Sequence, residues 1–381
     1  MSKLITVYDD NDSLNNVLSG LTLGVDEIFF VYHHEVPKTL FYNIEKVIDR
    51  HRDIKTHFIK LFYDKEEIQE LLDKHPDLIV DVGGAKYLSL LLFELAKETG
   101  HKIIYYDDEE NVIKDYRTHT IEKSDIFRLS IEDILNLKGG TIIEQMHVAA
   151  TDPETIDAIE VLVENNLNRY SQFVKYLSKI NNILASNKHN KISSTAYRLS
   201  DDQIKAIRTD KCYTRTRELF ELEDNNIIRF RNEKLRKLVG VSGAFLENYI
   251  YHHLIRDSEY DEVMMSAVID FSNGKEKYPV RCEVDLLVLK KNELLFVSCK
   301  SNKIDHNDIH EIYVHNAMFG NCLSKGVICL CEEANEKYPS MYLKAYESGV
   351  YVVDKSNIEE ENFPDVFKRI YNDTYVYDAL K

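Results

Sequence analysis

Residues 281–300, RCEVDLLVLKKNELLFVSCK, decide the fold of the C-terminal half of the chain. Two apolar runs flank the polar stretch 290–293, and this pattern predicts a hairpin of two strands joined by a tight turn. Side chains two residues apart on a strand lie on the same face. Glu283 and Asp285 on the first strand are therefore expected to point the same way.

The second strand ends with Ser298 and Lys300 on one face. Carboxylates and an ammonium group within apolar strands are costly to bury unless they meet a metal ion or a charged substrate. Upstream, the segment GAFLE at 243–247 opens a predicted helix that brings a third carboxylate, Glu247, within reach. The alternative is an edge hairpin with solvated charges. The apolar surroundings of these charges favour a site.

A Glu on a helix, an Asp on a strand and a Lys on the next strand, in that order, resemble the core of the PD-(D/E)xK nucleases. The resemblance implies that Glu247, Asp285 and the backbone carbonyl of Cys299 hold a divalent metal ion, Mn²⁺ or Mg²⁺. It also implies that Lys300 orients or activates the attacking water and steadies charge on the phosphate. Hard oxygen ligands and a nearby cation suit this chemistry.

Two positions depart from the nuclease motif. Val284 stands where the motif has Pro, which does not affect the chemistry, and Ser298 stands where it has a second acid. Glu283 is the candidate to supply the missing charge, because it shares a face with Asp285. The number of bound metal ions stays open. The implied catalytic residues are Glu247, Glu283, Asp285, Ser298 and Lys300.

Composition sets broad limits on the class of protein. The chain has 381 residues, 44% hydrophobic and 30% charged, which predicts two or three globular domains. The start MSKLITVYDDND has no basic leader before an apolar segment, and the longest apolar run, near 87–96, is broken by Glu94. We therefore expect a cytoplasmic protein that does not enter a membrane. Six cysteines without a CxxC pair indicate reduced thiols.

Strand and helix patterns alternate through the N-terminal part of the chain, with short gaps between them. Such alternation predicts a parallel, Rossmann-like α/β sheet. In these sheets ligands bind beyond the carboxyl ends of the strands. The predicted strands are 3–8, 27–32, 54–62, 78–82 and 101–106.

Two loops at such strand ends are candidates for ligand binding: 8–13, and 81–86 with the sequence DVGGAK. Two glycines let backbone N–H groups approach a phosphate at a helix start, and Lys86 adds positive charge. The alternative is a plain strand-to-helix turn. No GxGxxG follows the first strand, which counts against a dinucleotide dehydrogenase.

A Rossmann-like domain with this loop, followed by the nuclease core, resembles the CRISPR-ancillary nucleases that carry a CARF domain, over nearly the whole chain. The resemblance implies a homodimer that binds a cyclic oligoadenylate, with cyclic tetra-adenylate favoured, and then cleaves single-stranded RNA or DNA. It implies domains at 1–148 (ligand binding), 149–235 (helical connection) and 236–381 (nuclease). The implied ligand-binding residues are Asp9, Asp10, Asp12, Ser13, Gly83, Gly84, Ala85 and Lys86.

The connecting region contains a basic segment. Residues 205–237 hold ten Lys or Arg against six Asp or Glu, with Tyr213, Phe220 and Phe230 interleaved. Cations and aromatic rings together suit a single nucleic-acid strand, although a solvated helical face fits equally well. The overall formal charge of −17 argues against a general nucleic-acid coat protein.

Two functions from other classes stay open. Ser298 in place of an acid allows a ligand sensor with an inactive nuclease fold. A constitutive nuclease of the restriction or repair kind would use the N-terminal part only as a partner module. The segment HNDIH at 306–310 lacks the Glu of a zinc-protease HExxH motif, but His310 or Glu311 on this predicted helix could face the nuclease site.

Overall fold

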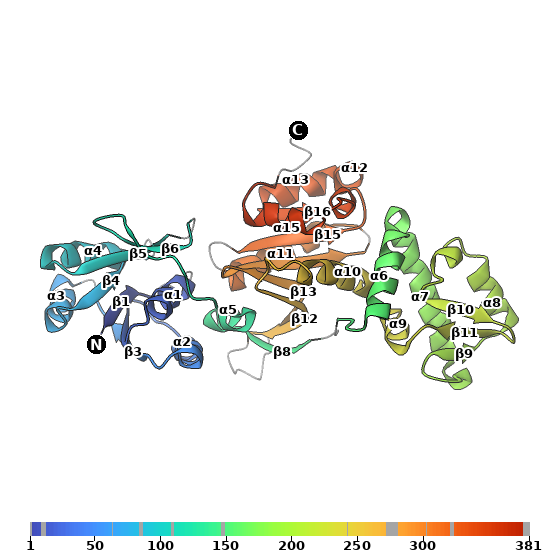
Figure 1. The fold of residues 1–381 in the computed structure, drawn as a ribbon, viewed down its shortest axis with the longest axis horizontal. Coiled ribbons are helices and arrows are strands. Elements are labelled where there is room, and N and C mark those ends of the chain that lie inside the picture. Colours follow the sequence, from blue (N-terminus) through green and yellow to red (C-terminus); the bar gives the residue numbers. More distant parts are fainter. Residues whose placement is uncertain are drawn as a thin grey trace.

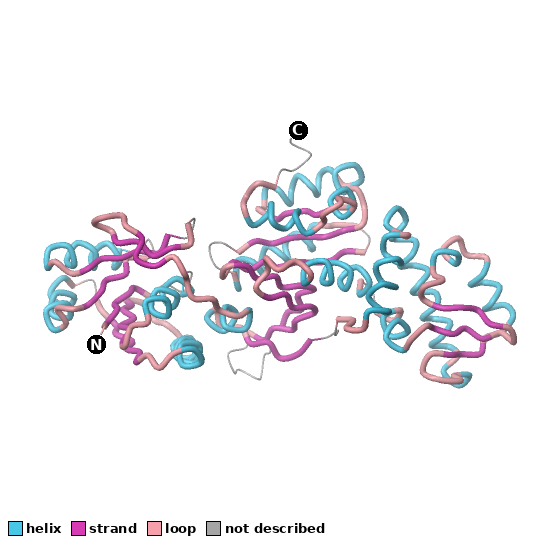
Figure 2. Tube along the Cα trace, viewed as in Figure 1, coloured by secondary structure: helices cyan, strands magenta, loops and turns pink. Residues whose placement is uncertain are grey.

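The computed structural model describes residues 2–8, 13–62, 64–83, 87–107, 110–145, 149–241, 243–271, 281–301, 303–320 and 324–375. Three lobes follow one another along the long axis of the molecule (Figure 1). The N-terminal lobe lies at one end, the lobe that contains the predicted nuclease hairpin lies in the middle, and a connecting lobe lies at the other end. Helices flank the strands of each lobe (Figure 2). No helix in the described ranges has the length and apolar character that crossing a membrane requires.

The N-terminal lobe is built on a seven-stranded sheet of order β3-β2-β1-β4-β5-β6-β7. The first five strands run parallel, and β6 and β7 are antiparallel additions, which confirms the Rossmann-like prediction. Leu4 belongs to one apolar core and Ile5 to another, so helices cover both faces of the sheet. The elements are β1 Lys3–Val7, α1 Ser13–Leu23, β2 Glu27–Tyr32, α2 Lys38–His51, β3 Lys55–Lys60, α3 Lys65–Lys74, β4 Leu78–Asp81, α4 Tyr87–Thr99, β5 Lys102–Asp107, β6 Val112–Asp115 and β7 Ile121–Lys123.

The connecting lobe is built from several short elements and not from one continuous helix. Asp152 caps the first of them, α6, which ends after twelve residues. Asn166 is buried and its side chain donates to the carbonyl of Leu162 at 2.7 Å, which stabilises this end. A small antiparallel sheet of order β10-β11-β9 follows. The elements are α6 Pro153–Glu164, α7 Tyr170–Ser186, β9 Ala196–Arg198, α8 Asp201–Arg208, β10 Phe220–Glu223, β11 Ile227–Phe230 and α9 Glu233–Leu238.

The middle lobe is built on a six-stranded sheet of order β16-β15-β14-β13-β12-β8. Its edge strand β8 precedes the connecting lobe in sequence, and pairs antiparallel with β12. The sequence places residues 141–145 in the N-terminal domain, whereas the structure uses them here. The elements are β8 Thr141–Gln145, α10 Ala244–Ile255, β12 Glu262–Asp270, β13 Arg281–Lys290, β14 Glu293–Lys300, α11 His306–Phe319, β15 Lys325–Leu330, α12 Ala334–Lys337, α13 Pro339–Glu347, β16 Val350–Val353, α14 Lys355–Ile358 and α15 Pro364–Tyr371.

Helix α5 (Ile131–Leu137) and the chain before it join the N-terminal and middle lobes (Figure 1). Arg50 of α2 pairs with Asp133 at 2.8 Å. On the other side, Asn292 at the tip of the β13–β14 hairpin bonds the backbone of Phe127 at 2.8 Å and of Leu129 at 2.9 Å. One apolar core contains residues of both lobes, so they are packed against each other.

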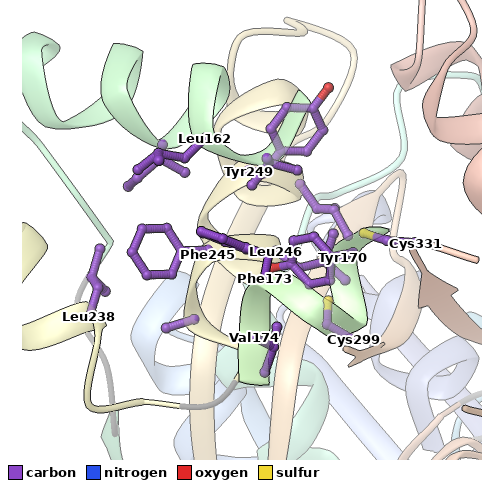
Figure 3. Close-up of a cluster of buried hydrophobic side chains, with 14 of the residues drawn as sticks. Leu162, Tyr170, Phe173, Val174, Leu238, Phe245, Leu246, Tyr249, Cys299 and Cys331 are labelled. Atoms are coloured by element: carbon purple, nitrogen blue, oxygen red, sulfur yellow. The ribbon is translucent and has the colours of Figure 1, made fainter. Parts of the chain in front are cut away.

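A second core lies beneath the first turn of α10 (Figure 3). Tyr170 and Phe173 of α7 pack there with Phe245 and Leu246 of α10, and Cys299 lies beside Tyr170. The start of the connecting lobe is therefore part of the floor under the strand that ends in Lys300.

Candidate nuclease site

The predicted hairpin is present. β13 and β14 pair from Lys290 and Glu293 at the turn to Leu286 and Val297. The two residues between the strands, Lys291 and Asn292, have φ of 50° and 67°, the left-handed backbone of a tight two-residue turn. This turn sets the register of the strands and hence the positions of the polar side chains at their far ends.

Asp285 lies on β13, one residue beyond the last pair of the two strands, Leu286 with Val297. Its carboxylate accepts the backbone N–H of Cys299 at 2.6 Å and the hydroxyl of Ser298 at 3.3 Å. Burial raises the pKa of Asp285, and these bonds and the charge of Lys300 only partly oppose that rise. The structure therefore brings Asp285, Ser298 and Lys300 together, as the sequence predicts.

Glu247 enters the same centre from the first turn of α10. The preceding Gly243 has φ of +87°, and a Cβ there would lie 2.8 Å from Glu247 Oε1, so the turn requires glycine. Glu247 is 6% exposed, and burial, followed by the charge of Asp285, raises its pKa to about 8. Two nearby carboxyl groups with raised pKa values form a centre in which the positive charge of Lys300 does not offset the effect of burial.

Ser266 is a residue of this centre that the sequence does not reveal. Its hydroxyl donates to Glu247 Oε2 at 3.2 Å, and it is fully buried within β12. Its φ of 51° is unusual for a non-glycine residue inside a strand. Strained backbone of this kind is concentrated at functional sites. A serine within the apolar run MMSAVID at 264–270 is the one sequence signal that could have found it.

Lys300 is held by α11. Its Nζ lies 3.0 Å from Asp308 Oδ1 and 3.7 Å from Glu311 Oε2. Burial lowers the pKa of Lys300, but the carboxylates of Asp308, Glu311 and Asp285 outweigh burial and leave it raised. The ammonium group is therefore charged at neutral pH. Glu311 thus faces the centre, whereas Asp308 was not anticipated from the sequence.

Glu283 lies at the exposed edge of the centre. Its side chain is on the same face of β13 as Asp285, and its charge contributes to the raised pKa values of both Asp285 and Glu247. Glu283 therefore adds negative charge near the position where Ser298 replaces an acid.

The donor set fits a hard divalent cation. Within the described ranges, no group of three or more His, Cys, Asp or Glu side chains is arranged to hold a metal ion. Glu247 and Asp285 nevertheless present one buried and one half-buried carboxylate, and a cation would reverse the raised pKa values of both. Together with a backbone carbonyl such as that of Cys299, they could form a small oxygen-ligand site.

The candidate ligand loops lie at neighbouring strand ends of the N-terminal sheet. β1 and β4 are adjacent and parallel, so Ser13 and Gly83 follow strands that end at the same edge. The Ser13 hydroxyl donates to the carbonyl of Leu137 in α5 at 3.3 Å, and the Gly83 N–H donates to Asp81 Oδ1 at 3.2 Å. The other predicted ligand-binding residues lie outside the described residues: Asp9, Asp10, Asp12, Gly84, Ala85 and Lys86.

A buried polar trio supports these two loops and was missed by the sequence analysis. Asn16 of α1 donates to Thr6 of β1 at 2.7 Å, and Thr6 donates to Asp81 of β4 at 3.5 Å. All three side chains are at most 2% exposed. Their bonds connect the strand before each loop, so a change at one loop can be transmitted to the other.

Comparison with known proteins covers both parts of the chain. A family model for the endonuclease domain of Card1-like proteins matches residues 231–321, which include the whole centre around Asp285. No curated protein is significantly similar in sequence. Among solved structures, protein VC1899 from Vibrio cholerae has a similar fold with a TM-score of 0.75 and 16% identity, covering 97% of each chain.

Two further structures are similar. Can2 from Sulfobacillus thermosulfidooxidans, in complex with cyclic tetra-adenylate, has a TM-score of 0.69 and 15% identity over 99% of this chain and 100% of Can2. A type III CRISPR defence DNA nuclease activated by cyclic oligoadenylate has a TM-score of 0.51 and 16% identity over 86% of this chain and 45% of its own. Residues 231–321 of the chain thus resemble the endonuclease domain of Card1-like proteins, and the overall fold is similar to that of Can2 and VC1899.

Proposed function

We propose that this protein is a metal-dependent nuclease of type III CRISPR defence, which a cyclic oligoadenylate bound by the N-terminal lobe switches on. The observation that carries the proposal is the carboxyl pair Glu247 and Asp285 beside the charged Lys300, within the region that matches an endonuclease family. The fold shared with Can2, which was determined with cyclic tetra-adenylate, favours that ring as the activator.

In this proposal each residue of the centre has a distinct task. Glu247, Asp285 and the carbonyl of Cys299 would hold the cation. When bound, a divalent ion supplies positive charge to the phosphate and lowers the pKa of a bound water. Ser266 fixes the orientation of Glu247, and the Cys299 N–H fixes that of Asp285. Lys300 steadies the charge that develops on the phosphate, and Asp308 holds its ammonium group in place.

The route from ring to nuclease centre runs through α5 in this proposal. Ser13, beside the first ligand loop, bonds the last residue of α5, and Asn292 bonds the segment before that helix. Asn292 is also one of the two turn residues of the β13–β14 hairpin, and Asp285 lies on β13. A ring that binds one arrangement of the loops better than another would shift α5 and the hairpin together.

A homodimer fits a symmetric ring, because each protomer then offers the same loops to equivalent halves of the ligand. The side chains of Phe62, which follows β3, and of Tyr87 and Leu90, in the first turn of α4, are 66%, 60% and 62% exposed. Exposed apolar side chains suit contact with a second copy.

The test is cleavage by variants in the presence of cyclic tetra-adenylate and Mn²⁺. Asp285→Ala and Lys300→Ala should each reduce the cleavage rate by at least about 100-fold, since the first removes a ligand of the proposed metal ion and the second removes the cation that steadies charge on the phosphate. Lys303→Ala, a neighbouring exposed lysine, is the matched control and should cleave normally. Normal cleavage by Lys300→Ala would show that the catalytic assignment is wrong.

A second candidate function is a ring sensor without cleavage. The observation that favours it is Ser298, whose hydroxyl donates to Asp285 where the nuclease motif has a second acid. Calorimetry with Mn²⁺ separates the two functions. Manganese binding that Asp285→Ala abolishes supports the nuclease, whereas no binding in the presence of the ring supports the sensor.

A further inference from the structure

Positive charge is concentrated in the part of the connecting lobe that follows α6, residues 166–241. This part contains 16 Lys or Arg and eight Asp or Glu, whereas the rest of the chain, which includes the four acids of α6, contains 32 and 57. A segment of net charge +8 therefore belongs to a protein whose remainder carries −25. Such separation attracts a polyanion to one end of an otherwise repulsive molecule.

The cations that are available to a partner follow helix α8. Ile204 and Ile207 are buried in the core of the lobe, so Lys205 and Arg208, one helical turn apart, are turned outward. Lys211 is also exposed. None of these three cations forms an ion pair with another residue that the structure describes.

Some other cations of the lobe are already neutralised. Lys237 pairs with Glu233 at 3.1 Å, and Arg231 pairs with Glu218 at 2.6 Å. Among the exposed cations without an ion pair in the described ranges, Lys205, Arg208, Lys211 and Arg217 follow one another along α8 and the chain after it, whereas Lys175, Lys188, Lys191 and Arg198 lie elsewhere in the lobe. A surface with this distribution suits contact with several phosphates in a row.

The aromatic rings do not take part in this surface. Phe220 and Phe230 are 2% and 1% exposed and pack on each other with ring centroids 5.6 Å apart. Tyr213 is half-buried against Phe220. Phe220 and Phe230 belong to the core of the lobe and are therefore not available to stack on bases. The Lys and Arg side chains that remain on the outside of the lobe can contact phosphate groups but do not distinguish one base from another.

Arg215 and Arg169 are further cations of the lobe. Burial, followed by the charge of Asp210, raises the pKa of Cys212, and the guanidinium groups of Arg215 and Arg169 oppose this rise. Arg169 directly precedes Tyr170, whose ring lies beside Cys299 in the floor of the centre (Figure 3).

We propose that Lys205, Arg208, Lys211 and Arg217 bind the phosphodiester backbone of the nucleic acid that the nuclease centre cleaves, several nucleotides away from the cleaved bond. This inference rests on the proposed nuclease function. Binding by this surface is independent of sequence, weakens steeply with salt, and favours long substrates over short ones. The backbone chemistry is common to single strands and duplexes, so both are tested.

The test measures binding of labelled 40-nucleotide single strands and duplexes to the full-length protein by fluorescence anisotropy, in EDTA, with and without cyclic tetra-adenylate. The variant combines Lys205→Glu, Arg208→Glu and Lys211→Glu. The matched control combines Lys74→Glu, Lys97→Glu and Lys123→Glu, exposed lysines of the N-terminal lobe that change the net charge equally. Replacement of the same three cations by Gln provides a milder variant.

The variant should bind on the order of tenfold or more weakly at moderate salt, and its slope of log Kd against log salt should fall by roughly 2 to 3, because about 0.7–0.9 is lost per phosphate contact. The control should keep the wild-type slope. Equal losses in variant and control, or an unchanged slope in the variant, would overturn the proposal. If the partner of this surface is an acidic protein and not a nucleic acid, the slope of log Kd against log salt for nucleic-acid binding will be unchanged in the variant.

Failure of the proposed nuclease function is separable from failure of this inference. Binding in EDTA needs no cleavage, so it is measured even if no ring activates the protein. Where the ring does activate, the variant should cleave a labelled tetranucleotide at the wild-type rate and a 40-mer several-fold more slowly. Equal slowing on both substrates would contradict a surface that lies outside the centre.

Discussion

Uptake of a divalent ion by the nuclease centre should release a proton from Glu247. A carboxyl group with a pKa of about 8 is about nine-tenths protonated at pH 7. Metal ions bind the carboxylate and not the carboxylic acid, so binding at pH 7 should release about 0.9 proton from this residue. The affinity for Mn²⁺ should rise about tenfold per pH unit up to about pH 8 and then level off.

The raised pKa of Glu247 also means that this residue destabilises the folded, metal-free protein once the pH is above about 4.5. In the unfolded chain the pKa of this group has its ordinary value of about 4.5, but in the folded chain the pKa is about 8. Stability is therefore lost as pH rises between these values, by about 5 kcal/mol in total, since one pKa unit is worth about 1.36 kcal/mol. Glu247→Gln removes the cost and should melt at a higher temperature than wild type at pH 8 in EDTA, but not at pH 4.

The assay is isothermal titration with MnCl₂ at pH 6, 7, 8 and 9, each in two buffers of different ionisation enthalpy. The difference in heat between buffers counts the protons released. Glu247→Gln should bind weakly and lose the proton attributed to this residue, whereas Glu221→Gln, an exposed acid of the connecting lobe, should behave as wild type. Manganese binding without proton release at pH 7, or with the same Kd from pH 6 to 8, would refute the reasoning.

Three further substitutions test other parts of the site. Ser298→Glu restores the missing acid next to Asp285, and should tighten Mn²⁺ binding at least about tenfold by calorimetry while lowering the melting temperature in EDTA. Asp308→Asn removes the 3.0 Å partner that helps to raise the pKa of Lys300, so the alkaline limb of the pH–rate profile should move to lower pH. Asn292→Ala removes two hydrogen bonds to the segment before α5, should cost about 1–3 kcal/mol of stability, and should reduce activation by the ring with its affinity unchanged, as measured by cleavage rate and calorimetry.

Local patterns were sufficient for the regular parts of the fold. The alternation that predicts strands at 27–32 and 78–82 agrees with β2 and β4 to within a residue, because a doubly covered parallel sheet requires apolar runs. The hairpin followed from its apolar strands and polar turn. By contrast, β8 is mostly exposed, and the short strand β9 has little pattern of its own, so their pairing depends on partners that are distant in sequence.

The centre could be predicted only where its residues share an element or a motif. Asp285 and Lys300 are placed by a two-residue period on strands that the turn holds in register. Ser266 depends on a left-handed backbone inside a strand, and Asp308 serves also in the cap of α11, which hides its contact with Lys300. Such contacts arise from tertiary packing, and spacing along the chain carries no signal for them.

Cleavage of labelled single-stranded RNA, single-stranded DNA and plasmid by the wild-type protein, with Mn²⁺ and with or without cyclic tetra- or hexa-adenylate, tests the proposed function most directly. The expected result is cleavage only when a ring is present, with cyclic tetra-adenylate the more effective. Cleavage at the same rate without any ring would contradict the switch, and no cleavage under any condition despite tight ring binding would contradict the nuclease.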